Sequence, residues 1–204
     1  MDFIKRYTTK EGIRLAVAVT TATVEEARAR HGLSPVATAA LGRTMTGALL
    51  MAGDFKNDEN VSVRLKGNGP LGVVHADAFA DNTVRGYVDN PKVDIPLKYA
   101  GKLDVGGAVG HEGEVQVTRF TKLRQDYTSQ SPIQSGEVAE DLAYYLYTSE
   151  QIPATISLGV LVGTDCTVTA AGGFLVQALP DATDEALSEA PLDVICSLDQ
   201  CGLL

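Results

Sequence analysis

The chain has 204 residues, of which 45% are hydrophobic, so it is long enough to bury a sizeable core as one large or two small domains. Its 17 basic and 26 acidic residues give a net charge of -9, which argues against a nucleic-acid or anionic-membrane binder. Three cysteines, no signal peptide and no run apolar enough to span a bilayer predict a cytoplasmic protein without a disulfide framework.

The N-terminal region is predicted to form a hairpin followed by a short helix. Residues 3–7 and 13–21 flank a turn that contains glycine. One face of the second strand is apolar and consists of Ile13, Leu15, Val17 and Val19. Thr23 and Glu26 have the spacing of a capping box, which predicts a helix that ends before Gly32.

Residues 34–53 predict a long helix with both ends marked. Ser34 is a capping residue, Pro35 suits the first helical position, and Gly53 is expected to end the helix in the left-handed conformation. The segment has almost no polar face, so we expect it to be covered on several sides. Arg43 and the internal threonines and glycines disfavour a membrane span.

Strands dominate the rest of the chain. The segments 61–66, 72–79 and 83–88 predict a meander of three strands, and 114–120 predicts another strand. Ser135 is expected to cap a helix whose apolar stripe consists of Val138, Leu142, Tyr145 and Leu146. Further short apolar strands are predicted at 156–162, 166–172 and 173–179.

The order of these elements predicts the fold class and the domain organisation. Strands outnumber helices and cluster by type, which is typical of an α+β fold rather than a doubly wound one. The strand pattern stops near residue 180. We therefore expect a core domain over residues 1–180 and a tail over residues 181–204.

The strongest local motif is the loop Gly67–Gly72, which reads G-x-G-x-x-G after a predicted strand. Asp89 lies at roughly the distance expected of a ribose-binding acid, so a dinucleotide site is one alternative. That site needs a helix after the loop, whereas the residues after Gly72 read as a strand. A tight turn between strands is the favoured interpretation, and no cofactor-binding residue is predicted.

The histidines give little indication of catalysis or metal binding. His75 and Asp77 share one face of a strand, where a hydrogen-bonded structural pair is the favoured interpretation over a catalytic one. His31 suits the C-terminus of a helix, and His111 lies in a glycine-rich loop. Without a nucleophile motif or a second ligand near any histidine, no catalytic and no metal-ligating residue is predicted.

The cysteines and a tyrosine cluster also favour structural interpretations. Cys166 is predicted to be a small core residue of a strand. Cys196 and Cys201 are spaced more widely than the pairs of zinc knuckles and redox motifs. Helix packing accounts for Tyr144, Tyr145 and Tyr147, although a contact surface is the alternative.

Seven ordered blocks of the sequence carry a family resemblance over residues 1 to about 182. They are RHGLSPVATAALGRTMTGALLMA, GNGPLGVVHADA, VRGYVDNP, GKLDVGGAVG, SGEVAEDLAYYL, SEQIPATISLGVLV and AAGGFLVQALPDA. Together they resemble the 33 kDa chaperonin (heat shock protein 33) family, the redox-regulated chaperones of the bacterial cytoplasm. The resemblance implies a three-layer β/β/α domain in which the helix over residues 34–53 is a long central element.

The same resemblance implies a function without catalysis. Members of the family are ATP-independent holdases that bind unfolding client proteins under oxidative and heat stress, and they are expected to form a homodimer on activation. Their reduced form holds zinc in a C-terminal module with a C-x-C and a C-x-x-C pair. Oxidation releases the zinc and melts the module, since zinc–thiolate binding supplies roughly 10–16 kcal/mol of folding free energy in small domains.

This sequence departs from the family pattern at the position of the switch. It contains neither a C-x-C nor a C-x-x-C pair, so the zinc module is expected to be absent and no metal ligand is carried over. The client-binding residues stay unassigned. Two hypotheses from other classes stay open: a small-molecule enzyme that uses the loop Gly67–Gly72, and a structural dimerisation module.

Overall fold

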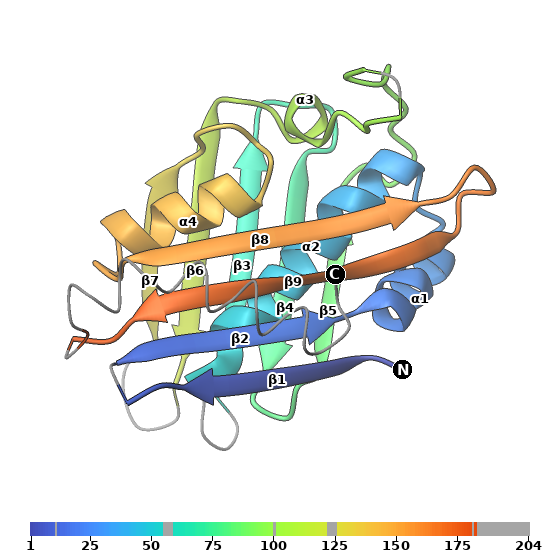
Figure 1. Cartoon of the computed structure of the whole chain (residues 1–204). Coiled ribbons are helices and arrows are strands. Elements are labelled where there is room, and N and C mark those ends of the chain that lie inside the picture. Colours follow the sequence, from blue (N-terminus) through green and yellow to red (C-terminus); the bar gives the residue numbers. More distant parts are fainter. Residues whose placement is uncertain (11, 55–58, 100, 122–125, 181, 183–204) are drawn as a thin grey trace.

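A computed structural model of the chain describes residues 1–10, 12–54, 59–99, 101–121, 126–180 and 182, and it contains two antiparallel sheets (Figure 1). The first sheet has the order β1-β2-β9-β8, with β1 at Phe3–Thr8, β2 at Ile13–Val19, β9 at Val168–Ala178 and β8 at Ala154–Val162. The second sheet has the order β5-β4-β3-β6-β7, with β5 at Val84–Val88, β4 at Val73–Phe79, β3 at Asn60–Gly67, β6 at Gly113–Phe120 and β7 at Tyr127–Pro132.

The helices are α1 at Thr21–His31, α2 at Pro35–Met51, α3 at Val105–Val109 and α4 at Ala139–Thr148, with a short 3-10 helix at Ala52–Asp54. Two antiparallel sheets with helices packed on them confirm the predicted α+β class. In the part of the chain that the structure describes, none of these helices has the length and apolarity needed to cross a bilayer.

Helix α2 lies between the two sheets (Figure 1). It contacts β4 and β5 of the second sheet and β8 and β9 of the first. All but two of its residues are buried, as expected for a helix with almost no polar face. Gly42 and Gly47 allow the close packing, because a Cβ there would lie 2.6 Å from Val24 and 2.5 Å from Leu142.

The start of α2 is confirmed, but its end differs from the prediction. The Ser34 hydroxyl accepts a hydrogen bond from the backbone N–H of Ala37 at 3.3 Å, and Pro35 is the first helical residue. The helix ends at Met51 and continues as a 3-10 turn, in which Gly53 does not adopt the left-handed conformation. The expected glycine stop was therefore wrong at this end.

Two other predicted helix caps were also wrong. Helix α1 ends at His31, and Gly32 follows it as expected, with a left-handed φ of 59°. The helix begins at Thr21, before the capping box that was expected at Thr23 and Glu26. The Thr23 hydroxyl instead donates to the carboxylate of Asp2 at 2.7 Å. In α4 the N-cap is Val138 rather than Ser135.

The strand predictions fail at β9, a central strand of the first sheet, and at β7, an edge strand of the second. The opening hairpin and the meander β3-β4-β5 are confirmed. The segments 166–172 and 173–179 belong to one continuous strand, β9, which starts at Val168. Strand β7 was not predicted, because its polar sequence lacks an apolar alternation. The proposed tail lies almost wholly outside the described residues, so the boundary near residue 180 stays a prediction.

Candidate functional site

The two faces of β2 differ in side-chain size. Ala16 and Ala18 point toward α2 and belong to the main core. Leu15 and Val17 alternate with them and therefore point to the opposite, outer face of the first sheet. The small inward residues let the helix lie close to the sheet, and the larger apolar residues are placed outside.

Strand β9 repeats this arrangement beside β2. Leu175 points inward and is buried in the main core, whereas Phe174 and Val176 point outward. The register places Phe174 opposite Val17 and Val176 opposite Leu15. These four outward side chains pack into a hydrophobic cluster that is separate from the core around α2.

The strands at the two edges extend the outward apolar surface. On β1, Phe3 is 37% exposed and Tyr7 is 47% exposed, and Tyr7 lies opposite Leu15. On β8, Leu161 is 60% exposed. We call the whole set the outer apolar face; it consists of Phe3, Tyr7, Leu15, Val17, Leu161, Phe174 and Val176.

A groove of about 670 Å³ runs across this face where β8, β9 and β2 meet. Gly159 on β8 lies opposite Gly172 on β9, so the centre of the groove has no side chains to fill it. Its apolar walls include Val17, Val19, Leu161 and Phe174. The groove is therefore shaped by two paired glycines and lined by side chains of the outer apolar face.

The side chains of the outer apolar face differ in exposure. Phe3, Tyr7 and Leu161 are exposed, whereas Leu15 and Val17 are only 8% and 7% exposed. Burial of apolar surface contributes about 25 cal/mol per Å² and has no directional requirement. Exposed apolar side chains that gather on one face of a protein often mark interaction sites. A surface of this composition suits partners that expose apolar side chains without a shared sequence.

The Gly67–Gly72 loop is a turn between β3 and β4, as predicted. Its backbone N–H groups are already used: those of Gly69 and Leu71 donate to the carbonyl groups of Val109 and Ala108 at 2.9 and 3.0 Å. The Asp89 carboxylate accepts from the N–H of Val73 at 3.0 Å and serves the same turn. This geometry disfavours a phosphate cradle, because the donors that would bind phosphate hold α3.

His75 and Asp77 lie together on the outer face of the second sheet, also as predicted. The Nε2 atom of His75 lies 3.0 Å from Asp77, and the other oxygen of that carboxylate accepts from Arg85 at 3.0 Å. The His75 ring packs against Tyr87 with 5.1 Å between ring centres. Among the described residues, no serine, threonine or cysteine is hydrogen-bonded to the pair, so the arrangement is a polar network around the Asp77–Arg85 ion pair.

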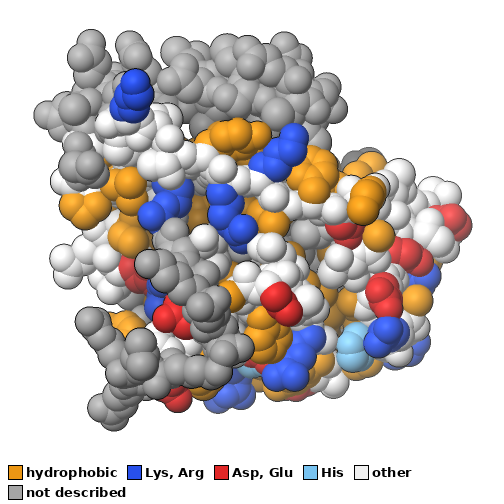
Figure 2. Space-filling model, turned by 90° about the horizontal axis from the view of Figure 1, so that it is seen from below, with side chains coloured by type: hydrophobic (Ala, Val, Ile, Leu, Met, Phe, Trp, Pro, Cys, Tyr) orange, Lys and Arg blue, Asp and Glu red, His pale blue; other side chains and the backbone are white. Residues whose placement is uncertain are grey.

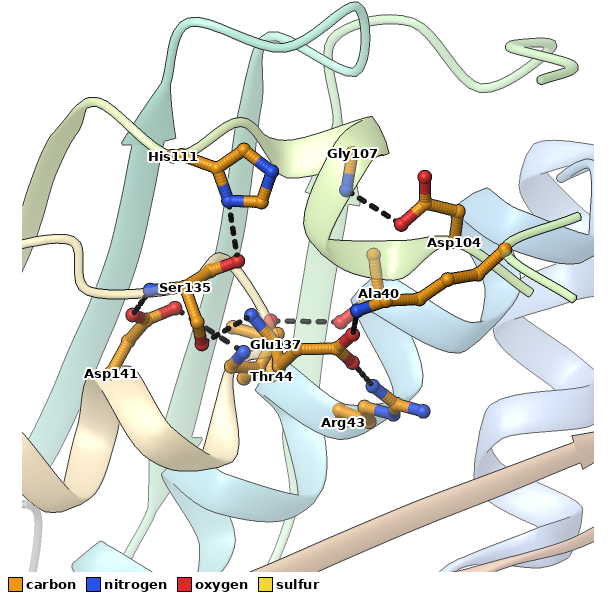
Figure 3. Close-up of polar contacts among 11 residues, drawn as sticks. Ala40, Arg43, Thr44, Asp104, Gly107, His111, Ser135, Glu137 and Asp141 are labelled. Atoms are coloured by element: carbon orange, nitrogen blue, oxygen red, sulfur yellow. Dashed lines mark hydrogen bonds and ion pairs between the residues drawn. The ribbon is translucent and has the colours of Figure 1, made fainter. Parts of the chain in front are cut away.

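A second polar cluster surrounds Glu137, in the turn before α4 (Figure 3). Its carboxylate accepts from Arg43 of α2 at 2.9 Å and from Lys98 at 3.0 Å. Burial raises the pKa of Glu137, but hydrogen bonds from Lys98 and Arg43 outweigh it and the pKa is lowered. His111 donates to the carbonyl oxygen of Ser135 at 3.0 Å. A carboxylate held ionised by two cations fastens the turn to α2 and is poorly suited to accept a proton.

The remaining predicted residues are not brought together into a site. Cys166 is exposed in the loop between β8 and β9, so its assignment to the core was wrong. Cys196 and Cys201 lie outside the described residues. Tyr145 is buried and packs as expected, with burial raising its pKa, whereas Tyr147 is 67% exposed. Within the described ranges, no three side chains of the kinds that bind metals are clustered.

The side of the molecule seen from below in Figure 2 carries side chains of both charges. Figure 2 shows basic and acidic side chains interspersed with hydrophobic ones on this side. A nucleic-acid interface would instead collect Lys and Arg on one face. The described residues on this side therefore do not form such a basic surface.

No client-binding residue could be assigned from the sequence, although part of the pattern of the outer apolar face is visible there. The apolar alternation of β2 shows which residues share a face but not which side of the sheet they lie on. The alanines between them were the missing signal, because small residues mark the side of a strand that lies against a helix. The GGFLV segment of β9 carries the same pattern, with Phe174 beside a glycine pair.

Comparison with known proteins identifies close relatives. The family described as Hsp33 protein matches residues 2–201. The 33 kDa chaperonin of Thermosynechococcus vestitus is 52% identical over 186 residues, which make up 90% of this chain and 62% of that protein. The 33 kDa chaperonin of Desulforamulus reducens is 49% identical over 187 residues, which make up 91% of this chain and 63% of that protein.

A solved structure has the same fold. The crystal structure of the 33 kDa chaperonin (heat shock protein 33 homolog) from Thermotoga maritima matches with a TM-score of 0.87 and 42% identity. The match covers 94% of this chain and 66% of that one. The chain thus spans a little under two thirds of the length of these relatives.

Proposed function

We propose that this chain, which belongs to the Hsp33 family, is an ATP-independent holdase that binds unfolding proteins through its outer apolar face. The observation that carries the proposal is the outward side of the first sheet, where the outer apolar face is interrupted by few polar residues, such as Lys5, Thr155 and Ser157. Unfolding proteins expose apolar segments of many sequences, and a non-directional apolar surface can bind them without recognising one motif. No nucleotide is needed, because burial of that surface drives the binding.

The zinc switch of the family is not assigned to the residues of this chain. Zinc sites that hold a fold closed use four ligands, usually cysteine and histidine. Among the described residues, Cys166 belongs to no cluster of three or more metal-binding side chains, and the sequence has no C-x-C or C-x-x-C pair. We propose that zinc belongs to full-length relatives and that this polypeptide binds none on its own.

We extend the proposal to the family architecture, to cellular location and to partners. The three-layer description, with α2 as the long central helix, is supported by the contacts of α2 with strands of both sheets. A cytoplasmic location is proposed from the sparse cysteines and the family, and the acidic charge supports the absence of nucleic-acid and anionic-membrane partners. A homodimer formed on activation is proposed from the family alone, and a role without enzymatic activity from the absence of a catalytic arrangement among the described residues.

Light scattering of a thermally unfolding client tests the proposed function. An equimolar amount of the 204-residue polypeptide is expected to suppress aggregation without ATP, and to do so equally with reductant or with peroxide. Suppression in neither condition would remove the holdase assignment. Suppression only after oxidation would mean that Cys166, Cys196 or Cys201 acts as a switch, which replacement of all three by serine would abolish.

A further inference from the structure

Strand β8 forms an open edge of the first sheet, on the side away from β9. In an antiparallel pair, alternate residues direct their N–H and C=O groups away from the neighbouring strand. No hydrogen bond joins these outward groups of β8 to any other residue that the structure describes. The edge is therefore a row of free backbone donors and acceptors beside the groove.

The sequence of β8 lacks the charges and the proline that usually protect such an edge, although helix α4 contacts part of the strand. Exposed edge strands are commonly short or carry lysine, other charges or proline. Strand β8 has nine residues, ATISLGVLV, with no charged residue and no proline. Its only irregularity is a shift of register between Leu161 and Val162, at its C-terminal end.

The other three edges are protected. Strand β1 carries Lys5 and Arg6. Strand β5 has five residues and includes Arg85. Strand β7 is polar and ends in Pro132. Protection at three edges makes the open edge of β8 a specific feature of the fold.

We propose that an extended apolar segment of an unfolding protein adds to β8 as a further antiparallel or parallel strand of the first sheet. Backbone hydrogen bonds to the β8 edge hold the segment, and its alternate side chains bury against the groove beside Leu161 and Phe174. This mode, strand addition, gains affinity from main-chain groups that every polypeptide has. It deepens the proposed holdase function and rests on it, because it says how clients without a common sequence are bound.

Gly159 provides a clean test, because it lies in the middle of β8 and a Cβ added there meets no atom within 4 Å. Gly159→Lys places a protecting charge on the edge, and Gly159→Ala is the matched control without charge. Gln130→Lys adds the same charge to the β7 edge of the second sheet, where Gln130 is exposed. Thermal melting establishes that all three variants fold.

The probe is a fluorescent peptide of alternating valine and threonine, about ten residues long so that it matches one strand. A control peptide of the same sequence is N-methylated at alternate residues, so its methylated edge cannot form a β-ladder with β8. Fluorescence anisotropy is expected to show binding of the first peptide, with affinity reduced roughly tenfold or more by N-methylation or by Gly159→Lys. Gln130→Lys is expected to bind like the unaltered chain, and Gly159→Ala to bind more tightly than Gly159→Lys, because alanine narrows the groove without adding a charge.

Equal binding of the methylated peptide would overturn the inference, since the groove would then act through side chains alone. Binding that Gly159→Lys leaves unchanged would overturn it as well. A concentration-dependent dimer that is abolished by Gly159→Lys and not displaced by the peptide would assign the edge to a second copy instead. Aggregation suppression without peptide binding would refute strand addition and leave the holdase function intact, whereas peptide binding without suppression would refute the holdase function alone.

Discussion

The outer faces of the two sheets differ in composition, although both sheets pack on the same helix. Inward residues are apolar in each, as Ala16 and Ala18 of β2 and Val63 of β3 illustrate. The outer face of the second sheet carries ions and hydroxyls, among them Arg64, His75, Asp77, Arg85 and Thr118. The outer face of the first sheet instead carries the seven side chains of the outer apolar face.

An antiparallel sheet with one buried side normally has polar residues on the other. The second sheet follows that rule and the first does not. Packing against α2 is satisfied by the inward residues of both sheets, so it does not require outward leucine or phenylalanine. The proposed client binding accounts for this difference, and each prediction below can break or sharpen the distinction between the two outer faces.

The largest effect is expected in the shared core. Leu41 of α2 is fully buried, so Leu41→Asp places an unpaired charge between the two sheets. We expect a loss of about 4 kcal/mol or more of unfolding free energy, or failure to fold. Leu97→Asp is the control, because Leu97 is 52% exposed and the change there is expected to cost less than about 0.5 kcal/mol. Equal thermal melting temperatures of Leu41→Asp and Leu97→Asp would show that Leu41 of α2 is not packed in a core shared by the two sheets.

The next largest effect separates the two outer faces by function. Replacing Leu161 and Phe174 together by serine is expected to reduce client binding roughly tenfold, since the change removes apolar area from the groove. The matched pair on the second sheet is Ser62→Ala with Gln116→Ala, which is expected to leave client binding unchanged. Titration of client aggregation against chaperone concentration measures both, and equal losses in the two variants would contradict the comparison.

In each sheet, a glutamate carboxylate links a strand to a helix through hydrogen bonds. The two residues, Glu150 and Glu25, differ in burial. On the second sheet, Glu150 accepts from Arg119 of β6 at 2.6 and 2.8 Å and from the Tyr145 hydroxyl at 3.0 Å. Glu150 is only 10% exposed. Glu150→Gln is therefore expected to cost about 2 kcal/mol, because a charged partner is left poorly compensated. Chemical denaturation measures the loss, and Glu26→Gln on the exposed face of α1 is the control.

Removal of the Glu25 carboxylate, which links α1 to the first sheet, is expected to change stability least, by an amount that depends on pH. Glu25 of α1 accepts from Arg28 at 2.8 Å and from the N–H of Val168 of β9 at 2.9 Å, and these bonds lower its pKa to about 2. A carboxyl whose pKa is lower in the folded state stabilises the fold above its unfolded pKa of 4.5 and loses that contribution as pH falls toward 2.

Glu25→Gln tests this dependence. The difference in Tm between wild type and variant is expected to be constant above about pH 5 and to shrink as the pH falls through 4.5 toward 2. A difference that grows on acidification would contradict the assignment of the lowered pKa to Glu25. Glu26→Gln again serves as the control, since Glu26 pairs only with exposed Arg30 on the same helix.

Local sequence signals predicted the parts of the fold that local physics decides. The hairpin, the three-strand meander, the cap at Ser34 and the turn at Gly67–Gly72 all depend on alternation or turn chemistry within a few residues. Strand β7 depends on its pairing with β6, which its own polar sequence does not show. The N-cap of α4 rests on a local contact of another kind: Asp141, the third helical residue, accepts from the N–H groups of Ser135 and Val138 at 3.0 and 3.3 Å. Such contacts leave no periodic trace in the sequence.

The binding surface shows the same limit. Alternation in β2 predicted which residues share a face, and only the position of α2 decides that this face is the outer one. The groove depends on Gly159 and Gly172, which lie on different strands and meet through the register of β8 and β9. The sequence of either strand alone therefore does not predict that Gly159 and Gly172 lie side by side.

Site-specific photocrosslinking tests the central claim most directly. A photoreactive phenylalanine analogue is placed at Thr155, which is exposed on β8 opposite Val176, and separately at Gln130, which is exposed on β7 of the second sheet. The folded variants are illuminated with a thermally unfolding client. Client adducts are expected from position 155 and not from position 130. Adducts of equal yield at both positions, or from position 130 alone, would contradict the assignment of client binding to the outer face of the first sheet.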